Sequence, residues 1–83
     1  SNHIFSYIEL DEQHAIIEVA VPEDWQGRSI GELDIRRKYG VNILGVKREN
    51  KTDVNISPET VLDADMTLLV LGENQKLKKH FRL

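Results

Sequence analysis

The chain has 83 residues, of which 40% are hydrophobic, and a formal charge of −3 at pH 7. This is the composition of one globular domain with a single small core. A net negative charge argues against a general nucleic-acid or membrane-surface role, because both need a broad basic face that attracts phosphate groups. The absence of cysteine excludes disulfides and thiolate metal sites and is compatible with a reducing cytosol. The apolar runs are too short for a membrane span, so no direct membrane insertion is expected.

The N-terminal part of the chain predicts two strands joined by an acidic turn. Residues 3–10 alternate imperfectly between polar and apolar, and residues 14–21 are rich in β-branched side chains and stop at Pro22. Both patterns are typical of strands. Ser1-Asn2 is interpreted as the remnant of a cleaved tag, so the domain is expected to comprise residues 3–83.

After a loop, the sequence predicts one helix over residues 30–39. SIGE at 29–32 matches a capping box, in which the serine hydroxyl and the glutamate carboxylate each accept a hydrogen bond from a free amide at the helix start. Gly40 is expected to end the helix in the left-handed conformation that favours glycine.

This predicted helix has two apolar faces. At 100° per residue, Ile30 and Leu33 lie on one side, whereas Ile35 and Tyr39 lie about 140° to 180° away from Ile30. A domain this small covers one face with its own sheet. We therefore expect the other face to contact a second subunit in a homodimer.

The remaining predicted elements are three strands and a helix, over residues 41–48, 52–56, 66–72 and 75–83. A turn at residues 50–51 separates the first two strands, and the unbroken apolar run of the third suggests burial on both faces. Asn74 is expected to cap the last helix, with Leu77 and Phe81 facing inward. The fold class predicted is α+β, with a small mixed or antiparallel sheet and two helices.

The sequence predicts no catalytic centre and no resident metal. The three histidines lie in separate elements without the spacing of a metal-ligand pair, and neither Ser29 nor Ser57 has a histidine near it in sequence to act as a base. The acidic turns at residues 9–12 and 63–65 offer carboxylates to a hard cation. Neither turn shows the twelve-residue calcium-loop pattern, so solvated turns are the preferred interpretation.

Three consecutive cations, Arg36, Arg37 and Lys38, come just before Gly40. Cations in the last turn of a helix interact favourably with its C-terminal carbonyl groups. That role explains Lys38 and one arginine, but it leaves Asn42 unexplained inside an otherwise apolar strand.

The junction between helix and strand is expected to bring Arg36 close to Asn42. Arginine supplies a fork of donors for phosphate oxygens, and asparagine supplies a donor and an acceptor, so the pair is able to hold an anion. Ile30, Ile43 and Pro58 would add an apolar floor for a flat ring. On chemistry alone, roles in the core or in a turn stay open for these three.

The run GRSIGELDIRRKYGVNILGVKRENK (27–51), followed by SPETVLDADMTLLVLG (57–72), resembles the C-terminal lobe of RCK (regulator of potassium conductance) proteins, also called the TrkA-C domain. The resemblance covers about residues 14–72. Within the family, residues 29–48 are most similar to KtrA and KtrC, the gating subunits of Ktr potassium uptake systems. One departure is Ala64, where the family usually has glycine, which suggests a turn without a positive φ.

The resemblance implies a two-fold dimer and a cytoplasmic regulatory domain that binds cyclic di-AMP at its dimer interface and represses potassium uptake. In this interpretation Arg36 of each subunit meets one phosphate, Asn42 hydrogen-bonds beside it, and Asp34 accepts from ribose or adenine groups. Three apolar residues enclose the adenines: Ile30, Ile43 and Pro58. A two-fold ligand on the axis of an isologous interface meets both copies equivalently.

The partners implied are a second copy, an octameric ring in the full-length protein and a potassium-translocating membrane subunit, with no nucleic-acid polymer. The N-terminal nucleotide-binding lobe of such proteins is missing from this sequence. Two alternatives stay open: a dimerisation module without its own ligand, and a cation-sensing lobe that uses the acidic turns.

Overall fold

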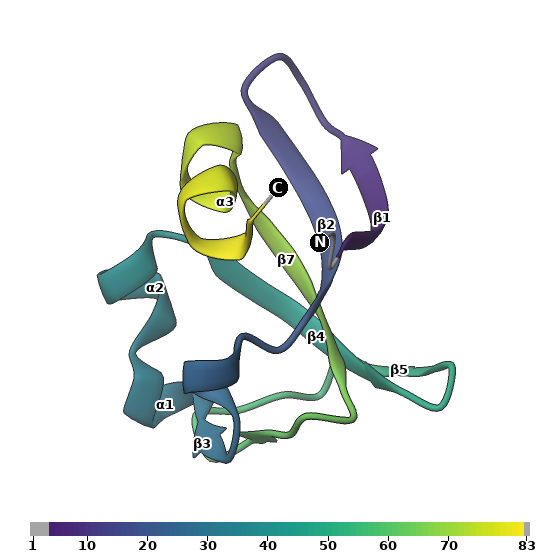
Figure 1. Ribbon diagram of the computed structural model, residues 1–83, viewed down its shortest axis with the longest axis vertical. Coiled ribbons are helices and arrows are strands. Elements are labelled where there is room, and N and C mark those ends of the chain that lie inside the picture. Colours follow the sequence, from purple (N-terminus) through teal and green to yellow (C-terminus); the bar gives the residue numbers. More distant parts are fainter. Residues whose placement is uncertain (1–3, 83) are drawn as a thin grey trace.

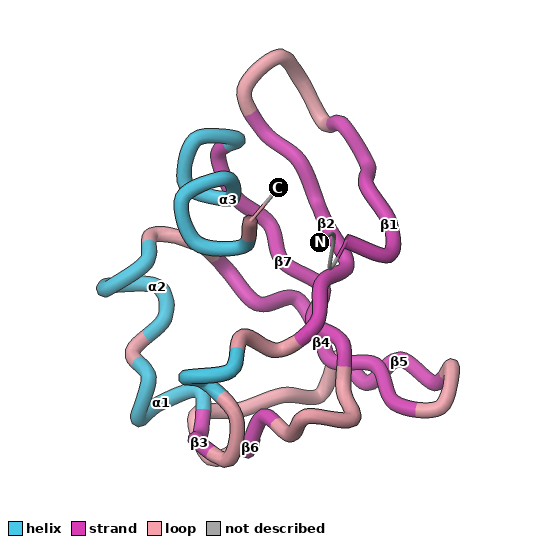
Figure 2. Tube along the Cα trace, viewed as in Figure 1, coloured by secondary structure: helices cyan, strands magenta, loops and turns pink. Residues whose placement is uncertain are grey.

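A five-stranded sheet forms the centre of the domain in this computed structural model, which describes residues 4–82 (Figures 1 and 2). Its strand order is β1-β2-β7-β4-β5, and every neighbouring pair is antiparallel. The strands of this sheet are β1 Ile4–Glu9, β2 His14–Ala20, β7 Thr67–Glu73, β4 Asn42–Arg48 and β5 Lys51–Asp53. A second sheet pairs β3 Arg28–Ser29 with β6 Val61–Leu62. The helices are the 3-10 turn η1 Glu23–Trp25, α1 Ile30–Leu33, α2 Ile35–Tyr39 and α3 Asn74–Phe81.

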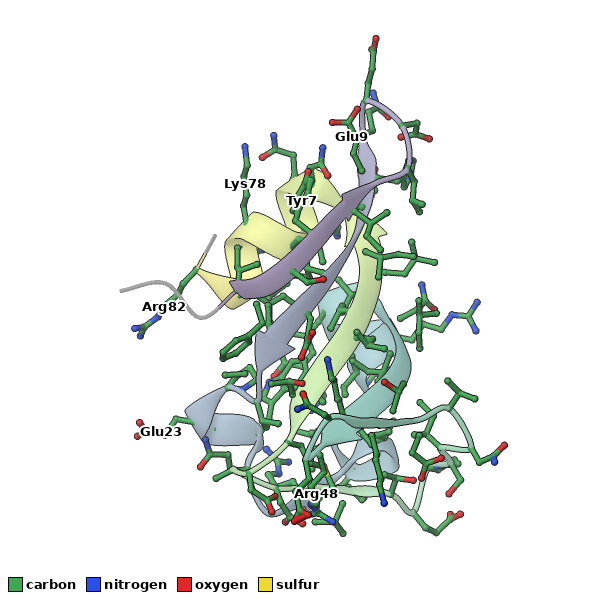
Figure 3. All side chains as sticks on the ribbon, turned by 90° about the vertical axis from the view of Figure 1, so that its right-hand side faces the viewer. Tyr7, Glu9, Glu23, Arg48, Lys78 and Arg82 are labelled. Atoms are coloured by element: carbon green, nitrogen blue, oxygen red, sulfur yellow. The ribbon has the colours of Figure 1, made fainter. Side chains whose placement is uncertain are left out.

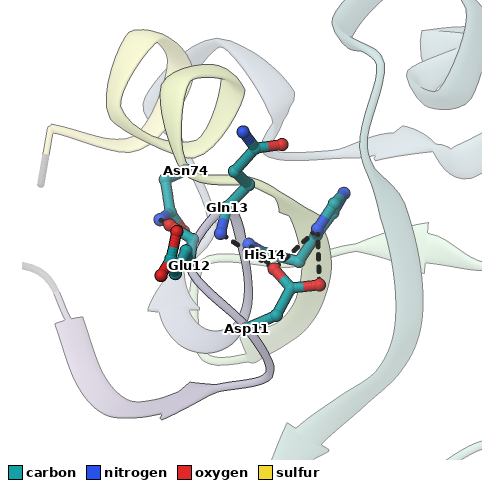
Figure 4. A network of polar contacts seen from close by, with 5 residues as sticks. All are labelled: Asp11, Glu12, Gln13, His14 and Asn74. Carbon is teal, nitrogen blue, oxygen red and sulfur yellow. Dashed lines mark hydrogen bonds and ion pairs between the residues drawn. The ribbon is translucent and has the colours of Figure 1, made fainter.

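The first hairpin is confirmed, with strands that end one residue earlier than predicted, at Glu9 and Ala20; residue 3 lies outside the described residues. Its acidic turn is organised by Asp11, whose Oδ1 accepts hydrogen bonds from the backbone N–H groups of Gln13 and His14, both at 2.8 Å (Figure 4). The His14 ring nitrogen Nδ1 lies 2.9 Å from the same oxygen. The hydrogen bond from Gln13, followed by that from His14, lowers the pKa of the Asp11 carboxyl. The turn therefore uses this carboxylate for its own donors.

The single helix predicted over residues 30–39 is wrong, because two short helices meet at Asp34. The capping box that starts α1 is confirmed: Ser29 Oγ accepts from the Glu32 amide at 3.1 Å, and the Glu32 carboxylate accepts from the Ser29 amide at 3.4 Å. Asp34 then adopts φ 50° and ψ 50°, and Figure 2 shows the non-helical link between α1 and α2 at this point. Gly40, at φ 70°, ends α2 as predicted.

The break has a packing reason. Leu33 and Ile35 are 1% and 3% exposed and belong to the same core. In a continuous helix their side chains would point about 200° apart at 100° per residue. A left-handed residue between them turns both toward the core, and aspartate is one of the few side chains that tolerates this conformation.

The break also removes the second apolar helix face. Ile30 and Tyr39, on opposite sides of the predicted helix, both pack against the same core as Leu33 and Ile35. The Tyr39 ring packs against Trp25 in a tilted arrangement, with 4.9 Å between ring centroids. The helical-wheel argument for a dimer is therefore wrong, and any dimer interface has to be found elsewhere.

The core lies between the sheet and the helices. Figure 1 shows α3 beside β2 and β7 and α2 beside the start of β4, and on this side alternate residues such as Ile17 and Val70 are fully buried. Trp25 belongs to this core and packs edge-on against Phe81, with 5.5 Å between ring centroids. The prediction that the strand at residues 66–72 is buried on both faces is wrong for one face, where Leu69 and Leu71 are only partly buried.

The other predicted elements need smaller corrections. The N-cap of α3 is Glu73 rather than Asn74, whose side chain instead donates to the Glu12 carbonyl oxygen at 3.1 Å and so ties the helix to the first hairpin (Figure 4). Leu77 and Phe81 face inward as predicted. The strand predicted over residues 52–56 is only three residues long, and Ala64 has no positive φ, as its departure from the family pattern predicted. Within residues 4–82, no helix has the length and apolar character of a membrane span.

Candidate functional site

A hollow of about 260 Å³ opens between the α1–α2 unit, the first half of β4 and the loop that precedes β6. Most of its lining is apolar, and three of its residues are polar. The lining residues are Ile30, Ile35, Arg36, Val41, Asn42, Ile43, Ile56, Ser57 and Pro58. Five of the six predicted site residues are among them, and the sixth, Asp34, is not. We call this hollow the Arg36 pocket.

The turn at Gly40 places two of the polar residues on one wall. The Gly40 amide donates to the Arg36 carbonyl oxygen at 3.0 Å, and the left-handed glycine leads directly into β4. Arg36, the second residue of the one-turn helix α2, and Asn42, the first residue of β4, therefore lie on either side of the same short turn. Both residues line the Arg36 pocket, and the distance of a few ångströms that the sequence suggested for the pair stays a prediction.

The opposite wall is held by contacts between α1 and the loop at residues 56–60. The Gly31 amide donates to the Pro58 carbonyl oxygen at 2.8 Å, and the Ile30 amide donates to that of Thr60 at 2.9 Å. A Cβ atom on Gly31 would lie only 2.9 Å from Pro58 Cβ, so glycine is required for this close approach. Pro58 and Ser57 are thereby fixed against the pocket.

The three polar side chains of the pocket are unpaired. Among residues 4–82, the side chains of Arg36, Asn42 and Ser57 make no hydrogen bond and no ion pair with the rest of the chain. The neighbouring Arg37, by contrast, donates from Nε to the Asp34 carboxylate. The pocket thus presents a guanidinium, an amide and a hydroxyl that are free to meet a ligand, over an apolar floor.

Asp34 has a different place from the one expected. Its carboxylate pairs with Arg37 one turn along, and its backbone forms the break between α1 and α2. A contact between Asp34 and a ligand remains a prediction, and in the unliganded chain that contact would have to compete with Arg37.

Sequence reasoning missed four lining residues: Ile35, Val41, Ile56 and Ser57. Ile35 and Val41 immediately precede two predicted site residues, but the sequence assigned Ile35 to a face for a second subunit and Val41 only to a strand. Ser57 and Ile56 reach the pocket because the loop returns to α1 through long-range backbone hydrogen bonds. The sequence signal for these two residues is the adjacent Pro58, which the sequence predicts to be part of the site.

The second acidic turn is occupied by an arginine. Arg48, at the end of β4, donates to Asp63 at 2.9 Å and lies 3.1 Å from Asp65 through its Nε atom. The hydrogen bond and charge of Asp65, with those of Asp63, raise the pKa of Arg48. In the described part of the chain, no group of three or more acidic or histidine side chains is arranged to hold a metal ion.

A larger hollow of about 470 Å³ lies between the end of β2, η1 and the end of α3. The hollow is lined by positively and negatively charged side chains: Lys79 and Arg82 from the end of α3, and Glu23 and Asp24 from η1. Burial, followed by the charges of Lys79 and Lys76, lowers the pKa of His80 and so disfavours a positive charge on this ring. Because the opposite charges balance, this hollow is less suited to an anion than the Arg36 pocket.

Comparison with known families gives a match over nearly the whole chain. The TrkA-C domain family matches residues 15–83. The Ktr system potassium uptake protein C of Bacillus subtilis (strain 168) is 35% identical over 72 residues, which cover 87% of this chain and 33% of that protein. The Ktr system potassium uptake protein A of the same organism is 26% identical over 77 residues, covering 93% and 35%. The chain therefore spans about a third of the length of these relatives.

Solved structures agree with the fold. The RCK C domain of the potassium transport protein KtrA, solved in complex with cyclic di-AMP, has a TM-score of 0.72 and 33% identity, over 80% of this chain and 78% of that one. The GsuK RCK domain has a TM-score of 0.79 and 26% identity, over 98% of this chain and 18% of that one. The RCK_C domain dimer of S. agalactiae BusR, in complex with cyclic di-AMP, has a TM-score of 0.64 over 78% and 92% of the two chains, and at 24% identity it supports the fold alone.

Proposed function

The chain belongs to the TrkA-C domain family, and we propose that it is a ligand-sensing regulatory domain that binds cyclic di-AMP in the Arg36 pocket and so controls potassium uptake. One observation carries the proposal: Arg36, Asn42 and Ser57 converge unpaired on an apolar hollow. The similarity to the KtrA domain that was solved with this dinucleotide supports the choice of ligand.

The pocket chemistry suits each part of such a ligand. A guanidinium forms paired, charge-assisted hydrogen bonds with phosphate oxygens, and this is the role proposed for Arg36. Asn42 would donate beside it, and the Ser57 hydroxyl lies on the facing wall as a further donor or acceptor. The apolar side chains of Ile30, Ile43 and other lining residues would enclose an adenine ring.

A dimer completes the site in this proposal. The hollow of about 260 Å³ is below the usual range of ligand pockets, about 300 to 1,000 Å³. Leu44, next to the lining residue Ile43, is 38% exposed, and Val54, which contacts the strand at Gly45, is 66% exposed. These apolar side chains beside the pocket are suited to a second copy related by a two-fold axis. A two-fold dinucleotide on that axis would then be enclosed from both sides.

The regulatory part of the proposal concerns a longer protein of the Ktr type. There, cyclic di-AMP bound to the domain would inhibit a potassium-translocating membrane subunit from the cytoplasmic side, within an octameric ring. The alternative of a dimerisation module lacks a use for the three unpaired polar side chains. The cation-sensing alternative is weakened because Asp11, Asp63 and Asp65 already accept hydrogen bonds from their neighbours.

Calorimetric titration of the chain with cyclic di-AMP tests the proposal. A hydrogen bond to a charged group contributes about 1.5 to 3 kcal/mol, so Arg36→Ala should weaken binding roughly tenfold or more. Arg37→Ala is the matched control, because Arg37 is adjacent, carries the same charge and pairs with Asp34 outside the pocket. Equal losses in the two variants, or no binding by the unmodified chain, would overturn the proposed site. Titrations with calcium and ATP test the alternative ligands.

A further inference from the structure

Strand β1 carries an unusual concentration of exposed apolar side chains. Seven large hydrophobic residues are exposed in residues 4–82, and four of them belong to β1 or directly follow it. These four are each more than half exposed: Phe5, Tyr7, Ile8 and Leu10. Ile8 pairs with the partly buried Ile16 and Tyr7 with the buried Ile17, so adjacent β1 side chains lie on opposite faces of the sheet.

The outer edge of β1 is also open to pairing. In the described residues β1 pairs with β2 alone, at the end of the five-stranded sheet. Natural edge strands are usually protected by lysine, proline, shortness or strong bulges. The strand IFSYIE has no lysine and no proline, and its one irregularity lies between Ile4 and Ser6. Residues 6–9 keep a regular register, so their backbone offers a straight edge to a further strand.

We propose that β1 pairs antiparallel with β1 of a second copy of this chain, joining two sheets into one across a two-fold axis. This inference is independent of the proposed function. β1 precedes residues 15–83, which the family matches, and β2 and β7 separate it in the sheet from β4, whose first residues line the Arg36 pocket.

Charge complementarity favours a second copy as the occupant. Glu9, with Asp11 and Glu12 beyond it in the sequence, lies at one end of β1, whereas Arg82 lies toward the other end in the view of Figure 3. An antiparallel pairing reverses one strand against the other. The acidic end of each copy thereby approaches the Arg82 end of its partner, while the apolar side chains in the middle of the strand meet one another.

With two separate isologous surfaces, the chain has a route to assemblies larger than a dimer. The β1 surface would act without ligand, and the surface beside the Arg36 pocket would act with cyclic di-AMP. Each interface would use its own two-fold axis, so the two together would link dimers into a closed ring or an open array.

Sedimentation velocity of the ligand-free chain over rising concentration tests the β1 interface. The unmodified chain is expected to form a dimer, and Ile8→Lys is expected to weaken that dimer at least tenfold. Val61→Lys is the matched control, because Val61 is also an exposed β-branched strand residue but lies in the other sheet. Phe5→Lys repeats the test at a second position if Ile8→Lys fails to fold.

Hydrogen exchange distinguishes strand pairing from looser contact. The amides of residues 5–9 should exchange more slowly as chain concentration rises, and this protection should be lost in the Ile8→Lys variant. A monomer throughout the high-micromolar range, or association that survives both lysine variants, would overturn the proposal. Arg36→Ala should leave the ligand-free dimer unchanged, so failure of the proposed ligand site and failure of the β1 interface give different results.

Discussion

Arg36 and Arg37 are adjacent in the sequence, but their side chains have different surroundings. Arg37 is neutralised by Asp34, whereas Arg36 lines an apolar hollow without a partner. Net charge at a helix end therefore does not describe the site. What matters is that Arg36 lines the pocket and, in the described residues, has no internal acid, so its hydrogen-bonding capacity stays available to a ligand.

The side chain of Ser57 gives a prediction about a single residue of the pocket. Its hydroxyl lines the Arg36 pocket and has no partner in the described chain, so Ser57→Ala should leave the free energy of unfolding unchanged. Binding of cyclic di-AMP should weaken roughly two- to tenfold, because a neutral hydrogen bond contributes about 0.5 to 1.5 kcal/mol. Calorimetry and urea denaturation measure the two quantities.

Ser29→Ala is the control, with the opposite expected pattern. The Ser29 hydroxyl caps α1 through the Glu32 amide, so its loss should cost about 1 kcal/mol of stability. If Ser57→Ala instead lowered stability and left the affinity unchanged, Ser57 would be a turn residue and not a ligand contact.

The sequence could predict the parts of the site that are local. Gly40 marks the end of α2, and the shortness of the following turn was enough to bring Arg36 and Asn42 together. Ser57 and Ile56 could not be placed in the same way, because their position depends on backbone hydrogen bonds between a distant loop and α1. Such long-range contacts leave no periodic signal in the sequence.

At the scale of elements, the break at Asp34 shows that local sequence signals and tertiary packing favour different backbone conformations in residues 30–39. The local signals over residues 30–39 favour one helix, since the segment begins with a capping box and has no proline to end it. The core, however, requires both Leu33 and Ile35, and a continuous helix cannot point both at it. Packing therefore determined the backbone here, which is why the sequence alone predicted the helix but not its interruption.

Substitutions of Asp34 distinguish a broken helix from a continuous one, because the two conformations predict opposite signs for the stability difference between the glycine and alanine variants. In a left-handed residue glycine costs less than alanine by about 1 kcal/mol or more, so Asp34→Gly should be more stable than Asp34→Ala. In a continuous helix the order would be reversed, by about 1 kcal/mol. Both variants lose the pair with Arg37, so that loss cancels in the comparison. Urea midpoints of the two variants measure the difference, and a more stable alanine variant would contradict the broken helix.

At the scale of the molecule, His80 couples stability to pH. Its ring packs edge-on against Tyr39 at 4.9 Å and links α3 to α2. Burial, then Lys79 and Lys76, lowers its pKa, while Glu23, Asp24 and Arg82 line the same hollow. As pH falls below about 6.5, the unfolded chain binds a proton before the folded chain does, so stability should decrease.

The variant His80→Phe tests this coupling. Phenylalanine keeps a ring against Tyr39 but cannot be protonated, so its urea midpoint should change less than that of the unmodified chain between about pH 7.5 and 5.5. Asp11, whose pKa is also lowered, titrates in a separate window below about pH 4. An equal decrease in both proteins would assign the pH dependence to other groups.

The symmetry of the proposed complex gives a further prediction for the whole molecule. If cyclic di-AMP binds on a two-fold axis between two Arg36 pockets, titration should saturate at about one ligand per two chains. The ligand would then stabilise the dimer, and the thermal midpoint of the complex should rise with chain concentration. Using the Ile8→Lys variant removes association through β1 from both measurements.

A charge placed on the proposed dimer surface tests the same symmetry without altering the pocket lining. Val54 is exposed beside β4 and outside the pocket, so Val54→Glu would bring two like charges close together if the two copies meet there. Its affinity for cyclic di-AMP should fall, although every lining residue is unchanged. Val61→Glu, an equivalent change at an exposed valine of β6, should bind as the unmodified chain does. One ligand per monomeric chain, with unchanged affinity in Val54→Glu, would show that a single copy holds the ligand and would reject the shared site.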